Sequence, residues 1–187
     1  YLGFDEFIDV SAFDVTRRLE HGLTSDRSSY DQVIYEYEHR DKDTPLFLFN
    51  VTIQNHGGYE DEDYKTTVEI EEAPGEFPQA EQYLSLTKKS DEALEYLIDY
   101  FSQQEDPVVI LFFGDHWPNL ESEFLTMLLG EDSESLSFEN TMREYEVPFL
   151  IWANYDLEGE EVEAVSLNYL SGLLLRAAGL EGTDYTN

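Results

Sequence analysis

The 187-residue chain carries 42 acidic and 10 basic residues, for a formal net charge of −32, and it has no cysteine. Too few cations are present to neutralise a phosphate backbone, which excludes nucleic acid as a partner. The missing cysteines exclude disulfides and thiolate metal sites. No run approaches the roughly 20 apolar residues of a membrane helix, and no repeat or linker divides the sequence, so we expect a single unit over residues 1–187.

The first 44 residues predict loops and one helix near residues 28–38, where Val33, Ile34 and Tyr37 share a face by their spacing. Residues 45–53, PLFLFNVTI, form a near-continuous apolar run that predicts a buried strand. This run ends in a polar cluster that includes His56 and is followed by two glycines. The polar stretch 57–79 then predicts a loop with a short strand at residues 67–70.

Apolar residues recur at spacings of three and four between residues 83 and 101, which predicts the longest helix, ending before Pro107. Residues 108–113 predict a second buried strand, and this strand stops at Gly114, Asp115 and His116. One carboxylate oxygen beside one imidazole nitrogen suits Zn or Mn. The alternative is a strand-end turn with a capping aspartate and a surface histidine. A third apolar run covers residues 147–155.

Helix followed by buried strand, repeated along the chain, predicts an α/β fold with a mostly parallel sheet flanked by helices. In such sheets the chemistry lies beyond the carboxyl ends of the strands. We therefore expect His56 and Asp115 to face the same crevice.

Arg17, Arg18 and Arg27 lie near His21 in a chain with only ten basic residues. A cluster of this kind could hold a phosphate through charge-assisted hydrogen bonds. It could equally pair with the surplus carboxylates.

Three motifs in this order resemble one known family: PLFLFNVTIQNHG at residues 45–57, FFGDHWP at residues 112–118 and VPFLIWANY at residues 147–155. They are similar to the bacterial phosphoglycerol transferases of the lipoteichoic acid synthase type, within the sulfatase and alkaline phosphatase superfamily. The similarity runs from YLGFDEF at residues 1–7 to LSGLLLRAAGL at residues 170–180. It covers nearly the whole chain but only the later half of the family's catalytic domain.

The resemblance implies a role for each matching residue. Asp115 and His116 fall where the family ligates a divalent metal, manganese in the first place, with zinc or magnesium as alternatives. His56 falls where the family contacts the phosphate of the glycerophosphate group. Arg17 and His21 fall in the substrate-side loop, although His21 stands where the family has a tryptophan. The nucleophilic threonine and the other metal carboxylate would lie upstream, so this chain holds no catalytic nucleophile.

The resemblance therefore implies part of a metal-dependent phosphoglycerol transferase of cell-envelope polymer synthesis. Its partner would be a phosphatidylglycerol-like lipid or a glycerophosphate polymer, and the fragment alone would be inactive. The parent would sit at the outer face of the bacterial membrane through an anchor before Tyr1, with this part soluble and extracellular. The alternatives are a sulfatase or phosphodiesterase of the same superfamily, or a non-catalytic acidic binding module.

Overall fold

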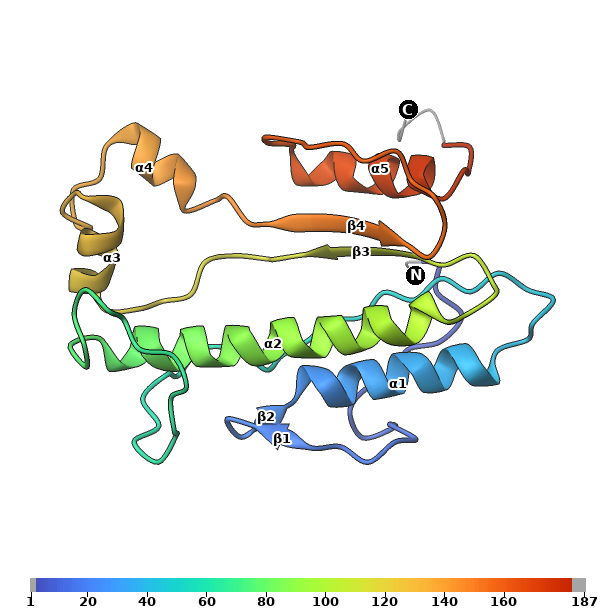
Figure 1. The fold of residues 1–187 in the computed structure, drawn as a ribbon, viewed down its shortest axis with the longest axis horizontal. Coiled ribbons are helices and arrows are strands. Elements are labelled where there is room, and N and C mark those ends of the chain that lie inside the picture. The colour runs from blue at the N-terminus through green and yellow to red at the C-terminus, as the bar shows by residue number, and fades with distance from the viewer. Residues whose placement is uncertain (1–2, 183–187) are drawn as a thin grey trace. The chain divides into compact units, whose positions relative to one another are not determined.

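A computed structural model describes residues 3–182, which divide into two compact units (Figure 1). The first unit comprises the residues up to Leu97 together with residues 118–137. The second comprises residues 98–117 together with those from Phe138 onward. The units interleave in sequence and their first boundary falls inside a helix, so no linker marks the division. Among the described residues, no helix is both long enough and apolar enough to cross a membrane.

The elements follow in chain order. The first unit contains β1 (Leu19–Glu20), β2 (Leu23–Thr24), α1 (Asp26–His39), most of α2 (Pro78–Ser102) and α3 (Ser122–Leu129). The second contains β3 (Val109–Phe113), α4 (Phe138–Arg143), β4 (Phe149–Ala153), the 3₁₀ helix η1 (Leu167–Tyr169) and α5 (Leu170–Ala177). The predicted helices near 28–38 and 83–101 are confirmed as α1 and α2, and the runs at 108–113 and 147–155 contain β3 and β4.

The β1–β2 hairpin turns on two residues, His21 and Gly22. Both have positive φ, 53° and 75°, which is the backbone of a type I′ turn and matches the twist of the strands. Glycine adopts this conformation freely, and histidine is among the side chains that tolerate it. The sequence analysis did not predict this hairpin.

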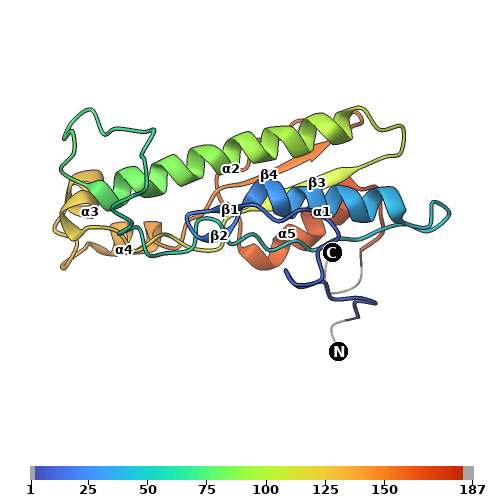
Figure 2. The same ribbon diagram turned by 90° about the horizontal axis from the view of Figure 1, so that it is seen from below.

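Helices α1 and α2 run side by side in the first unit (Figures 1 and 2). The hydroxyl of Ser25 caps α1 by accepting the Ser28 backbone N–H at 3.2 Å. Further along, the Tyr96 hydroxyl on α2 donates to Asp31 on α1 at 3.0 Å, and the Arg27 guanidinium lies over the Tyr96 ring.

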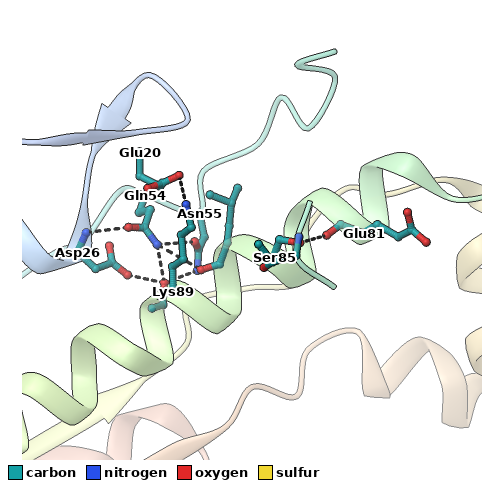
Figure 3. A network of polar contacts seen from close by, with 10 residues as sticks. Glu20, Asp26, Gln54, Asn55, Glu81, Ser85 and Lys89 are labelled. Carbon is teal, nitrogen blue, oxygen red and sulfur yellow. Dashed lines mark hydrogen bonds and ion pairs between the residues drawn. The ribbon is translucent and has the colours of Figure 1, made fainter. Parts of the chain in front are cut away.

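A buried polar cluster joins the start of α1, residues 54–55 and the middle of α2 (Figure 3). The backbone N–H of Asp26 donates to Oε1 of Gln54 at 3.1 Å. The Gln54 amide nitrogen therefore points the other way and donates to the Leu86 carbonyl (3.2 Å) and the Ser90 hydroxyl (3.1 Å). The Asn55 amide also donates to Ser90 (2.8 Å), and Ser90 donates to Oδ2 of Asp26 (2.5 Å). Residues 54–55 are thus held by both helices.

The segment 57–77 folds against the first half of α2 through the side chains of that helix. Ser85 Oγ accepts the backbone N–H groups of Thr67 (2.8 Å) and Val68 (3.0 Å), and Glu81 accepts those of Ile70 and Gly75 (3.1 and 3.2 Å). The strand predicted at residues 67–70 is therefore wrong, because its N–H groups bond to side chains and not to another strand.

The hydrophobic core of the first unit lies under this segment. Its buried members come from the 57–77 segment, from α2 and from residues 118–137: Tyr59, Ile70, Ala73, Phe77, Ala80, Leu86, Leu120 and Phe124. The Phe77 and Phe124 rings meet with centroids 5.6 Å apart. The core thus fixes the segment that follows His56.

The second unit is built on an antiparallel pair, in which Val109 faces Ala153 and Phe113 faces Phe149. The Asn154 side chain connects the end of β4 to the segment before β3. Its Oδ1 accepts the Val108 N–H at 2.8 Å, and its amide donates to the carbonyls of residues 101, 104 and 106. The Tyr155 hydroxyl donates to the Ala177 carbonyl on α5 at 2.8 Å.

The α/β class of the sulfatase type is confirmed by these elements and by the comparisons below, but the strand pairing differs from the prediction. Both strand pairs within residues 3–182 are antiparallel. The apolar run 45–53 forms no strand there, and its large side chains are exposed, with Val51 at 73%. A strand needs a neighbour for its backbone groups, and the described residues supply none for this run.

Replacing Ser85 by alanine should lower the free energy of unfolding by about 2 kcal/mol, because two N–H groups lose their acceptor at a fully buried position. Urea unfolding of the 187-residue chain measures this change. Ser102→Ala is the matched control, since Ser102 is exposed on the same helix and its hydroxyl donates to the Asp99 carbonyl. A Ser85 variant as stable as this control would contradict the assignment.

The stability of the chain should also carry the signature of a buried carboxyl at Asp26, which is 3% exposed. Burial raises the pKa of Asp26, although the hydrogen bond from Ser90 opposes the rise. A carboxyl whose pKa is higher in the folded state stabilises at low pH, and that contribution is lost as the pH rises through the folded pKa.

The free energy of unfolding of Asp26→Asn, relative to wild type, should therefore increase from about pH 4 upward and then level off. Urea unfolding at a series of pH values measures it. Asp91→Asn, which removes the same charge from an exposed position of α2, is the matched control. Parallel curves for the two variants would contradict the raised pKa.

Candidate functional site

Asp115 and His116 follow β3 directly and are both exposed. Oδ1 of Asp115 accepts the backbone N–H of His116 at 2.8 Å, and Oδ2 lies 3.6 Å from the Nε2 atom of His116. Nδ1 of His116 lies 2.7 Å from the Trp117 carbonyl. Since a carbonyl only accepts, Nδ1 carries the proton in this hydrogen bond, and in the neutral ring Nε2 is the nitrogen with the lone pair.

The turn that presents these two residues is held by the strand opposite. Gly114 donates its N–H to the Pro148 carbonyl at 3.0 Å, and a Cβ at Gly114 would lie 3.1 Å from the Cβ of Val147. Glycine is needed here because Val147 and Pro148 of the same chain come close to it. The Trp117 indole donates to the Glu146 carbonyl at 2.7 Å.

This geometry fits a divalent metal. Two ligand atoms each about 2.1 Å from one ion lie about 3.0–3.4 Å apart, so small rotations of two exposed side chains would let Oδ2 and Nε2 share it. A histidine ligand commonly donates its other ring nitrogen to a carbonyl, as His116 does. Within residues 3–182 no group of three or more His, Asp or Glu side chains forms a complete site.

His56 is exposed, in a turn closed by its own N–H donating to the Ile53 carbonyl at 3.0 Å. It is not enclosed by the core. Its flanks are fixed, because Asn55 bonds to Ser90 on one side and the Tyr59 hydroxyl donates to the Asn55 carbonyl at 2.6 Å on the other. Gly58 between them has φ 105°, a value that favours glycine. The role of His56 as a phosphate contact stays a prediction.

Arg17 is exposed and lines a surface groove of about 380 Å³ that also contacts Gly22 and residues 51–53. Within residues 3–182 it forms no ion pair, unlike Arg18 and Arg27, which lie 3.8 and 3.5 Å from the Asp31 carboxylate. The three arginines that lie near one another in the sequence therefore differ in their contacts. Arg18 and Arg27 pair with a carboxylate, while Arg17 keeps the proposed anion-binding role as a prediction.

His21 lies among aromatic rings, with its own ring stacked on Tyr59 (centroids 6.3 Å apart) and edge-on to Tyr64 (5.8 Å). Its Nδ1 atom is buried without a hydrogen bond. Next to it, Lys89 on α2 pairs with Glu20 on β1 at 2.5 Å (Figure 3). This surrounding favours a packing role for His21, and its substrate contact remains a prediction.

Ser90 was not predicted as a functional residue from the sequence. The signal was present, because Ser90 falls in the apolar stripe of α2 beside Leu86, Ala93 and Leu97, all of them buried. A polar side chain in such a stripe needs a hydrogen-bond partner. The burial of Asp26 was not foreseen from the sequence either.

The chain is similar to one protein family and to several known proteins. The profile described as Sulfatase matches residues 1–180. Two proteins of Rhizobium meliloti (strain 1021) are each 30% identical: one named "Putative cyclic beta-1,2-glucan modification protein" over 98% of this chain and 29% of its own length, and "Capsular polysaccharide biosynthesis protein RkpI" over 65% and 21%. The chain thus spans less than a third of these relatives.

Among solved structures, the Streptococcus pyogenes phosphoglycerol transferase GacH, in complex with sn-glycerol-1-phosphate, shares the fold with a TM-score of 0.67 at 19% identity. The likeness covers 93% of this chain and 42% of GacH. Because the Sulfatase profile covers nearly all of its residues, the chain belongs to the sulfatase family.

Proposed function

We propose that this chain is part of a metal-dependent phosphoglycerol transferase that takes glycerophosphate from a glycerophospholipid head group and adds it to a cell-envelope polymer. The observation that carries the proposal is the Asp115–His116 pair, whose Oδ2 and Nε2 atoms lie 3.6 Å apart with Nδ1 bonded to a carbonyl. Support comes from the family and from a structural neighbour that is a phosphoglycerol transferase bound to sn-glycerol-1-phosphate.

Asp115 and His116 are the residues of this chain that would hold the metal. Manganese is the first candidate, with zinc or magnesium as alternatives. When bound, a divalent ion stabilises negative charge on a phosphoryl oxygen and lowers the pKa of an oxygen nucleophile. The Trp117 carbonyl fixes the tautomer of His116, so that Nε2 is ready to bind without a prior proton shift.

His56 would donate a hydrogen bond to a phosphate oxygen of the glycerophosphate group. An exposed imidazole on a fixed turn can do this without moving the backbone, and preorganised donors of this kind stabilise charge that develops in the transition state. Arg17, exposed and without an ion pair in residues 3–182, could supply a second contact to the anionic head group.

Two classes of polymer are candidates for the acceptor. A lipoteichoic acid-like glycerophosphate chain is one candidate. The names of the two Rhizobium relatives concern a cyclic glucan and a capsular polysaccharide, which favours a glycan acceptor. With either acceptor, the reaction would take place at the outer face of the membrane, with the complete protein anchored there.

A sulfatase or phosphodiesterase is the second enzyme candidate, and release of sulfate from a sulfate ester by the complete protein would establish it. A non-catalytic acidic binding module is the candidate of another class, supported if the complete protein turns over neither ester.

In the complete protein, His116→Ala should remove most of the bound manganese and reduce transfer at least a hundredfold, because the site loses one of its few ligands. Metal content and glycerophosphate release from a lipid analogue measure the two effects. His39→Ala is the control, since His39 is exposed on α1, where its ring contacts Tyr35.

The 187-residue chain alone, with two of the proposed ligands, should bind manganese weakly and release no glycerophosphate. Near-normal turnover of the His116 variant would show that the metal assignment is wrong. Metal-dependent turnover by the chain alone would show that the proposed upstream ligands are unnecessary.

His56→Ala in the complete protein should leave the metal content unchanged and reduce turnover roughly ten- to a hundredfold, the effect of losing one charge-assisted hydrogen bond of about 1.5–3 kcal/mol. His56→Gln, which keeps a donor, should retain part of the activity. Loss of metal would make His56 a metal ligand, and unchanged turnover would remove it from the site.

A further inference from the structure

His56 sits on a short bridge between two anchored residues. Asn55, the residue before His56, donates through its side-chain amide to the Ser90 hydroxyl at 2.8 Å. After it, Tyr59 is buried in the core and its hydroxyl donates to the Asn55 carbonyl at 2.6 Å. Both bonds converge on Asn55, so the direction in which His56 leaves the fold is set by how Asn55 is held.

Asn55 is held by one oxygen atom of α2. A serine hydroxyl donates one hydrogen bond and accepts two. The Ser90 hydroxyl accepts from the amides of Asn55 and Gln54 and donates to Oδ2 of Asp26, at 2.8, 3.1 and 2.5 Å. Its full capacity is used, and each partner belongs to a different segment from Ser90 itself.

The three bonds also fix one another's direction. The Gln54 amide cannot rotate, because its oxygen accepts the Asp26 N–H at 3.1 Å. With both acceptor positions of Ser90 filled by amide donors, its hydrogen points to Asp26. The Asp26 carboxylate, 3% exposed at the start of α1, therefore serves as the acceptor that orients the hydroxyl.

We propose that Ser90, oriented by Asp26, is a positioning residue that fixes His56 in its substrate-binding direction through Asn55. The inference rests on the proposed function in taking His56 as the phosphate contact. It adds a mechanism for holding that contact on an exposed loop. Ser90 is buried and acts through the residue before His56.

Ser85 offers a matched comparison on the same helix. It too is buried and accepts two donors, but these are the backbone N–H groups of Thr67 and Val68, and none of its bonds reaches residues 54–56. Loss of either serine hydroxyl should destabilise the fold. Only loss of the Ser90 hydroxyl should act through His56.

The test is a double-mutant cycle in the manganese-loaded complete protein, with glycerophosphate transfer as the readout at a temperature where all variants are folded. Ser90→Ala should reduce kcat roughly tenfold, since small misplacements of a catalytic contact have effects of this size or larger, while the metal content stays unchanged. In the His56→Ala background, Ser90→Ala should have no further effect. Ser85→Ala should change activity by the same factor in both backgrounds, and Ser90→Thr should restore most of the loss.

A second readout does not depend on activity. Amide hydrogen exchange of residues 54–59 should accelerate in Ser90→Ala and remain unchanged in Ser85→Ala, where residues 67–70 should accelerate instead. Equal factors for Ser90→Ala in the two backgrounds, or unchanged exchange at 54–59, would overturn the positioning role while leaving His56 as a phosphate contact. Full activity of His56→Ala itself would overturn both proposals at once, and the two failures are thereby distinguished.

Discussion

The first unit depends on one constraint: backbone N–H groups in its loops and at the starts of its helices must find acceptors without an extended sheet. Side chains meet this need. The Glu121 carboxylate accepts the N–H groups of Gln79 and Ala80 at the start of α2, at 2.7 and 3.1 Å. It satisfies donors that every helix leaves free and adds negative charge where the helix dipole favours it. Glu81 and Ser85 do the same for the loop that crosses α2.

Because α2 supplies these acceptors at successive turns, the loops follow its surface, and the segment that carries His56 is placed by the same helix. A helix is well suited to this task, since its own backbone groups are satisfied internally and its side chains project at fixed intervals. The position of His56 is therefore set by a regular element, although His56 itself lies outside any helix or strand.

Elements governed by local pattern could be predicted from the sequence. The periodic apolar residues of α1 and α2 sufficed, because each helix is long and satisfies its own hydrogen bonds. The strands around 109–113 and 149–153 were also foreseen, but their antiparallel pairing was not, since pairing depends on which segments meet. The run at 45–53 has the composition of a strand and lacks a neighbouring strand in residues 3–182. Composition alone could not reveal that.

The same division applies to the site. Asp115 and His116 are adjacent in sequence, so their potential as metal ligands could be predicted directly. The two glycines that follow His56 were also evident in the sequence. The contacts of Ser90 join positions 26, 54, 55 and 90, and no local pattern connects them. Arg17 and its arginine neighbours looked equivalent in sequence, and only the position of Asp31 on α1 separates them.

The exposed run at 45–53 also bears on how the chain behaves in solution. An apolar segment with unused backbone groups is a template for adding a strand from another molecule, and so favours aggregation. The net charge of −32 opposes such encounters at neutral pH through mutual repulsion. That protection weakens in concentrated salt, which screens it, and towards the isoelectric point of about 4.1, where it vanishes. Repulsion between negatively charged chains thus opposes their association through residues 45–53. This repulsion lasts only while the carboxylates are ionised.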